Sequence, residues 1–183
     1  GYFDPVPSIG WIALGMGCVL LGSTVGTSVT KLDLTPPLDE PIRFNRLRRK
    51  VYVYRFHYCW WRPFNNALWY VKPEVYDWND LRAEEVCIYV PTVTYNSGVV
   101  IAVVKPGTNE VIDRFPLSDG TQGGASYWNM AVAFMQSGPY VLPKFDRPPR
   151  DWNNEDPGLN LARRFAPKVK WPEAMDIESR TAP

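Results

Sequence analysis

The chain opens with a long stretch that is almost free of polar and charged residues. Ile9 to Gly26 is 18 residues without a charged side chain. A helix of that length covers roughly 27 Å, which is close to the thickness of the hydrocarbon core of a bilayer. Trp11 lies near one end, where interfacial aromatics are enriched, and Gly22 and Gly26 form a Gly-xxx-Gly pair suited to close helix packing in lipid. The pattern predicts a membrane-spanning helix within residues 1–30.

The same residues leave alternatives to a spanning helix. A glycine-rich helix buried in a soluble domain is compatible with the composition. A secretory signal peptide is disfavoured, because only "GYFDPVP", with no basic residue, precedes the apolar run. The glycines also suggest one half of a helical hairpin whose other half would precede Gly1. The cations that follow the helix place the next domain in the cytoplasm by the positive-inside rule.

Alternation of apolar and polar positions begins after a spacer. Residues 31–41, "KLDLTPPLDEP", are expected to form an extended linker, because their prolines disfavour helix. "IRFNRLRRKVYVYRF" then predicts strand, tight turn and strand. Its second strand places Tyr52, Tyr54 and Phe56 on one face, and we expect this aromatic face to form the core. Trp69 and Trp78 are expected to join the same core.

The alternation continues over the rest of a domain at residues 42–142. "NALWYVKPEVYDW" predicts a strand that Pro73 restricts to an edge or an end, and "NDLRAEEVCIYVP" predicts the next strand. "GVVIAVV" and "VIDRFPL" flank the turn "KPGTNE" as a hairpin. From residue 125 to 136 the period becomes helical, and Gly138-Pro139 ends the helix. The fold class is therefore α+β: a mostly antiparallel β roll or partial barrel capped by one C-terminal helix.

Residues 143–183 form a proline-rich tail. "PGLNLARRFAP" predicts one short helix. Trp152 and Trp171 are large apolar side chains in otherwise polar sequence, which is atypical of a disordered tail. The tail is expected to pack on the domain or on a partner.

Charge and cysteine content exclude several classes. A net charge of +1 gives no global attraction to nucleic acid, and no nucleic-acid-binding motif is present. The three cysteines are far apart and lack a CxxC pair, which argues against a disulfide framework or a zinc site. With His57 as the single histidine, no metal or cofactor is expected.

A basic cluster lies at the turn of the first hairpin. Its members are Arg43, Arg46, Arg48, Arg49 and Lys50. One interpretation is a topology signal on a solvated hairpin tip. The other is contact with anionic lipid headgroups, where each cation contributes about 1 kcal/mol.

A second cluster, "HYCWWRPF", follows the hairpin. Neighbouring residues in a strand face opposite sides, so Trp60 and Trp61 cannot both enter one core. At least one is expected to be exposed, or to pack on the membrane interface, the tail or a partner. Tryptophan and arginine are typical of binding hot spots. The predicted partner-binding residues are Trp60, Trp61, Arg62, Phe64, Trp152 and Trp171.

Nothing in the sequence predicts catalysis. The carboxylates of "DWNDLRAEE" are interpreted as a turn with a cap at Asp77 or Asn79. "SDGTQGG" lacks the lysine of a phosphate-binding loop, and Ser118 and Ser126 lack a nucleophile-elbow pattern. We therefore predict no catalytic residues and no enzymatic activity.

The element order resembles the pleckstrin-homology-like fold as it occurs in bacterial membrane proteins. "RFNRLRRKVYVYR" and "WNDLRAE" further resemble a bacterial family of unknown function with two transmembrane helices, whose members are often encoded near type VI secretion effectors. The resemblance implies an inner-membrane protein with a cytoplasmic domain that binds an effector as an immunity or accessory protein. The alternatives are an anionic-lipid-binding domain and a membrane-active toxin.

Overall fold

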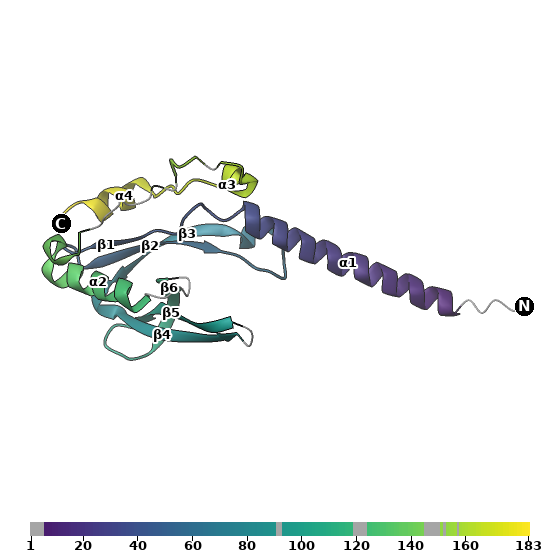
Figure 1. The fold of residues 1–183 in the computed structure, drawn as a ribbon, viewed down its shortest axis with the longest axis horizontal. Coiled ribbons are helices and arrows are strands. Elements are labelled where there is room, and N and C mark those ends of the chain that lie inside the picture. Colours follow the sequence, from purple (N-terminus) through teal and green to yellow (C-terminus); the bar gives the residue numbers. More distant parts are fainter. Residues whose placement is uncertain (1–5, 91–92, 119–123, 145–150, 152, 157) are drawn as a thin grey trace, which may run out of the picture. The chain divides into compact units, whose positions relative to one another are not determined.

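The computed structural model describes residues 6–90, 93–118, 124–144, 151, 153–156 and 158–183 of the chain (Figure 1). The helices are α1 (Val6–Leu34), α2 (Gly124–Ser137), α3 (Leu161–Phe165) and α4 (Glu173–Arg180). The strands are β1 (Ile42–Asn45), β2 (Lys50–His57), β3 (Tyr70–Asp77), β4 (Leu81–Val90), β5 (Val93–Val104) and β6 (Val111–Pro116). Three short 3₁₀ turns are η1 (Asn66–Leu68), η2 (Trp78–Asp80) and η3 (Pro139–Val141).

The chain divides into two compact units. The helical unit comprises Gly1–Glu40, Arg55–Lys72 and Asp151–Val169. The sheet unit comprises Pro41–Tyr54, Pro73–Arg150 and Lys170–Pro183. Strands β2 and β3 carry the chain from one unit to the other.

The strands form two antiparallel sheets of three strands each, in the orders β1-β2-β3 and β4-β5-β6. The α+β class and the predicted hairpins are confirmed, and Pro73 lies on the edge strand β3, where its missing N–H is tolerated. No closed barrel forms among the described residues, so the expected roll is not a continuous one. The reason lies after β3, where Asp77 accepts a hydrogen bond from the Asn79 N–H (2.9 Å) and starts η2. This turn redirects the chain, and β4 begins a new sheet.

The core of the sheet unit uses the valine face of β2, which corrects the expectation that the tyrosine face forms it. Val51 and Val53 cluster with Leu81, Val99, Ile101, Val103 and Phe115. Tyr52 and Tyr54 are also buried, but they alternate with these valines and face the other way. The C-terminal tail covers that side: the Tyr54 ring lies 5.3 Å from the Trp171 ring, and the Tyr54 hydroxyl accepts a hydrogen bond from the Lys170 N–H (3.2 Å).

Helix α2 packs as its periodicity predicts. Ala131 and Met135 are buried, and Trp128 stacks on Trp78 with ring centroids 5.1 Å apart. Trp78 therefore joins the sheet-unit core as expected. The helix ends at Gly138, whose φ of +89° is a conformation that glycine adopts without strain.

Helix α1 is longer than predicted. It continues through Leu34, into residues expected to form the extended linker, because the first proline after it is Pro36. The Thr35 N–H still bonds to the Lys31 carbonyl (2.8 Å) and completes the last turn. The helix is long and apolar enough to cross a membrane.

Candidate functional sites

The basic hairpin, residues 43–50, is largely occupied by the chain's own C-terminus. Arg43 Nη1 lies 2.6 Å from Asp176 Oδ1, and its guanidinium carbon is 4.5 Å from the centre of the Trp171 ring. Lys50 Nζ lies 2.7 Å from Glu178 Oε1. The ion pairs hold the pKa of the Asp176 carboxyl and of the Glu178 carboxyl below their usual ranges, chiefly through the hydrogen bonds from Arg43 and Lys50.

The remaining hairpin residues bond mainly to backbone carbonyls at the end of α4. Asn45 Nδ2 lies 3.0–3.2 Å from the carbonyl oxygens of Glu178, Ser179 and Thr181. Arg48 donates to the carbonyls of Thr181 (3.1 Å) and Ala182 (2.7 Å). The last carbonyls of a helix have no partner within it. The hairpin therefore supplies a C-terminal cap to a helix that lies more than a hundred residues later in the sequence.

Two arginines of the hairpin lie outside this contact. Arg49, with a φ of 55°, donates to Asn79 Oδ1 (2.8 Å). Arg46 is exposed. It borders a groove of about 340 Å³ lined by residues 44–47 of the hairpin, by Phe134 and Pro139, and by residues 179–182. Leu47, at the same groove, is also exposed.

Helix α4 was not predicted from the sequence, although a signal for it is present. Pro172 precedes the helix, Glu173 and Asp176 lie in its first turn, and Arg180 lies in its last. Acidic residues at the start and basic residues at the end suit the helix dipole. Arg180 also pairs with Asp176 one turn earlier (3.2 Å).

The aromatic loop, residues 57–69, belongs to the helical unit and is attached to the end of α1. The Trp60 carbonyl accepts a hydrogen bond from the buried Ser28 hydroxyl (2.8 Å). Lys31 Nζ lies 2.5 Å from Asn66 Oδ1 and 5.3 Å from the centre of the Trp69 ring. Trp69 is buried against Phe56 and Tyr58, so it packs in this unit and not in the sheet-unit core that was expected.

The predicted partner-binding residues have different surroundings. Trp61 and Phe64 are 82% and 69% exposed, and Arg62 is exposed too. Trp60 is half-buried, and Trp171 is engaged with Tyr54 and Arg43 of its own chain. Trp152 lies outside the described residues. The exposure expected for one of the paired tryptophans is thus found at Trp61.

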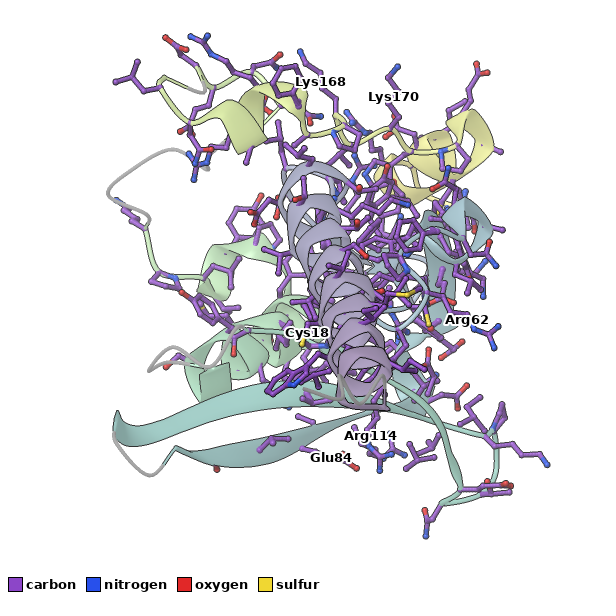
Figure 2. The ribbon with its side chains drawn as sticks, turned by 90° about the vertical axis from the view of Figure 1, so that its right-hand side faces the viewer. Cys18, Arg62, Glu84, Arg114, Lys168 and Lys170 are labelled. Carbon is purple, nitrogen blue, oxygen red and sulfur yellow. The ribbon has the colours of Figure 1, made fainter. Side chains whose placement is uncertain are left out.

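No described group of side chains resembles a catalytic or metal centre. Glu84 points towards Arg114 (Figure 2), whose Nε lies 2.9 Å from Glu84 Oε2, and this hydrogen bond lowers the pKa of the Glu84 carboxyl. Asp77 serves as the cap of η2. His57 stacks on Tyr70 with ring centroids 5.2 Å apart. Among the described residues, no cluster of three His, Cys, Asp or Glu side chains is placed to hold a metal ion.

The hydroxyl of Tyr76 lies against two carboxylates. Its oxygen lies 2.8 Å from Glu74 Oε2 and 2.6 Å from Asp113 Oδ2. Burial and the two carboxylates raise the pKa of Tyr76 far above its ordinary value. The phenol therefore stays protonated, and it links β3 to β6 as a hydrogen-bond donor.

Together these features define an α+β protein with a long apolar N-terminal helix and a sheet unit whose basic hairpin is bound by the chain's own C-terminal segment. The chain belongs to the family of unknown function DUF6708, whose model matches residues 19–157. The match includes the second half of α1, the basic hairpin, the aromatic loop and α2. Neither the curated proteins nor the solved structures contain a match to this chain.

Proposed function

We propose that this protein is a non-catalytic, membrane-anchored interaction protein, in which α1 spans the bilayer and the sheet unit binds a protein partner. The observation that carries the proposal is the uncovered apolar surface of α1. Large side chains such as Ile12, Leu20 and Leu21 are each more than 60% exposed along this helix. Apolar surface of that extent is unfavourable in water and normally marks an interface with lipid or protein.

The polar side chains of α1 support placement in hydrocarbon. The hydroxyls of Ser23 and Thr24 donate to the Leu20 carbonyl (2.9 and 2.8 Å), and the Thr27 hydroxyl donates to the Ser23 carbonyl (2.8 Å). Each hydroxyl donor is satisfied within the helix, so lipid can surround it without leaving an unpaired donor. The first charged side chain of α1 is Lys31, which lies beyond the uncovered stretch.

The partner role is supported by the exposed groove at the hairpin and by the sequence resemblance to proteins encoded near type VI secretion effectors. On this proposal the sheet unit lies on the cytoplasmic side of the inner membrane, as the cations after α1 favour. The partner is then a secreted effector or another protein of the same locus, bound in an immunity or accessory role.

The membrane anchor is tested by placing a charge in the middle of α1. Val19→Arg should reduce the fraction of protein that resists alkaline extraction from membranes, because an arginine at the centre of a spanning helix costs about 3 kcal/mol. Val19→Leu is the matched control and should leave that fraction unchanged. Equal membrane retention of the two variants would contradict a spanning α1.

The partner role is tested by affinity purification from native membranes in mild detergent, with mass spectrometry of the recovered proteins. We expect one protein in near-equal amount, and its loss in Leu47→Asp at the groove. Ile112→Asp is the matched control, since Ile112 is similarly exposed (59%, against 63% for Leu47) but lies on β6, outside the groove. Recovery of no stoichiometric protein would argue against the binding role.

Lipid binding by the basic hairpin is the second candidate. It is disfavoured because Arg43, Arg48 and Lys50 already contact the C-terminal segment, so that anionic headgroups would have to displace α4. The remaining candidate, a membrane-active toxin, predicts growth arrest when the chain is expressed, and Val19→Arg should then relieve the arrest.

A further inference from the structure

We infer that two segments around the C-terminal end of α1 form a collar that enters the headgroup region of the same bilayer. The collar has two parts. One is the aromatic loop (residues 57–69), and the other is the segment 158–168, which includes α3. The inference rests on the proposed function, because it requires α1 to span the membrane. It adds a second membrane contact and assigns the exposed aromatic residues to lipid.

The position of the collar follows from where α1 becomes covered. Residues 9–26 of α1 are almost entirely exposed, whereas Ser28 is fully buried and holds the Trp60 carbonyl. Ser28 lies two residues, or about 3 Å of helix rise, beyond Gly26. A bilayer that covers residues 9–26 therefore ends where the aromatic loop begins.

The second segment reaches the same end of α1. Helix α3 lies beside α1 (Figure 1). Just after the end of α1, the Leu38 N–H donates to the Pro167 carbonyl (3.3 Å). Two segments that are far apart in the sequence thus both lie near the C-terminal end of the apolar helix, within the helical unit.

The collar has the composition of a membrane interface. Its exposed apolar side chains are Trp61 (82%), Phe64 (69%), Leu159 (98%) and Phe165 (70%). The two segments carry four cations, Arg62, Arg163, Arg164 and Lys168, and no carboxylate. Arg62 and Lys168 are both exposed (Figure 2). Aromatic rings next to lysine and arginine at a helix end are typical of the boundary between headgroups and hydrocarbon, and the cations complement anionic lipids.

The aromatic loop presents its rings from a fixed backbone. Pro63, between Arg62 and Phe64, is fully buried, and the Trp69 indole N–H donates to the Arg62 carbonyl (3.3 Å). The Asn65 N–H donates in turn to that same carbonyl (3.2 Å). Because these contacts hold the backbone on both sides of the exposed rings, little conformational entropy is lost when lipid covers them.

Site-specific photo-crosslinking in the full chain tests the collar. p-Benzoylphenylalanine replaces Phe64 or Phe165, and the protein is reconstituted alone in phosphatidylcholine vesicles with or without phosphatidylglycerol. Val19 on α1 is the reference position for the spanning helix. Tyr140, an aromatic residue of the sheet unit that is 97% exposed, is the comparison for non-specific adducts.

We expect lipid adducts at positions 19, 64 and 165, with several-fold lower yield at position 140. The yield of lipid adducts at positions 64 and 165 should rise when phosphatidylglycerol is present. The double variant Arg62→Glu, Arg164→Glu should remove that rise. Lipid adducts at 19 without adducts at 64 and 165 would overturn the collar and leave the anchor intact. No adduct at 19 would contradict the anchor itself. Crosslinked dimers at 64, or equal yields at 64 and 140, would also overturn the assignment to lipid.

Discussion

The basic hairpin and the collar both contain cations and aromatic rings, but their side chains have different surroundings in the folded chain. In the hairpin, Arg43 and Lys50 face carboxylates of α4, and Trp171 lies between Tyr54 and Arg43. In the collar, Trp61, Phe64 and Phe165 are exposed. A basic, aromatic sequence is therefore compatible with an internal contact and with an external one.

The difference depends on what the rest of the chain supplies. The segment that reaches the hairpin contains carboxylates and the open carbonyl end of a helix, both of which complement cations. Residues 158–168, whose helix α3 lies beside α1, contain three cations and no acid. Attraction within the chain closes the first site, whereas Trp61, Phe64 and Phe165 of the second stay exposed, as the proposed lipid contact requires.

The largest expected effect is the difference in unfolding free energy between alanine variants of Trp171 and of Trp61. Trp171→Ala should lower the free energy of unfolding of the sheet unit by about 2–3 kcal/mol, since it removes a large packed ring and uncovers Tyr54. Trp61→Ala should change it by less than about 0.5 kcal/mol, as is usual for an exposed residue. Hydrogen exchange of the β2 amides under native conditions measures both values. Similar losses for the two variants would remove the distinction between an internal and an external contact.

An intermediate effect is expected at the cap of α4. Asn45→Ala removes the side-chain amide that contacts the Glu178 and Ser179 carbonyls, while the Thr181 carbonyl keeps its bond from Arg48, and the change should weaken the attachment of α4 by about 1–2 kcal/mol. Asn66→Ala, at the exposed bond to Lys31, is the matched change in the helical unit and should have little effect on its own neighbours. Amide exchange rates in α4 and in the aromatic loop report the two results. Unchanged protection of α4 in Asn45→Ala would show that the cap does not hold the helix.

The smallest expected effect is a pH dependence confined to the hairpin. Because the pKa values of Asp176 and Glu178 are lowered in the folded protein, their contribution to stability is complete above their unfolded pKa values of about 4 and is lost as the pH falls below them. Protection of α4, corrected for intrinsic exchange rates, should therefore decrease in acid. Asp176→Asn with Glu178→Gln should flatten this dependence. The aromatic loop, residues 57–69, contains no carboxylate and is the comparison segment for this pH range.

Local pattern was sufficient where neighbouring residues decide the outcome. The hairpin at residues 42–57, the hairpin around Pro106-Gly107, and α2 with its end at Gly138 were predicted because turn chemistry and side-chain period act within a few residues. One of the paired tryptophans, Trp61, is exposed as expected, although residues 60 and 61 lie in a turn after β2 and not in a strand. The apolar run of α1 was evident for a similar reason, since length and composition alone define a candidate span.

Long-range contacts decided the rest. Both faces of β2 are apolar or aromatic, so the sequence offered two candidate core faces, and the packing of Val51 and Val53 against Ile101 and Phe115 selected one of them. The turn at Trp78 is local and was expected, but the pairing of β4 with β5 in a separate sheet, where a continuous roll was expected, depends on contacts distant in the sequence.

By itself, the sequence determined that this protein has an apolar helix, antiparallel hairpins, one amphipathic helix and two basic, aromatic clusters. Only the tertiary structure decided that α4 closes the first cluster and that α3 lies beside α1. The physical reason is that groups more than a hundred residues apart in the sequence come into contact only where the folded backbone brings them together. The apolar periodicity of a single helix or strand does not predict such contacts.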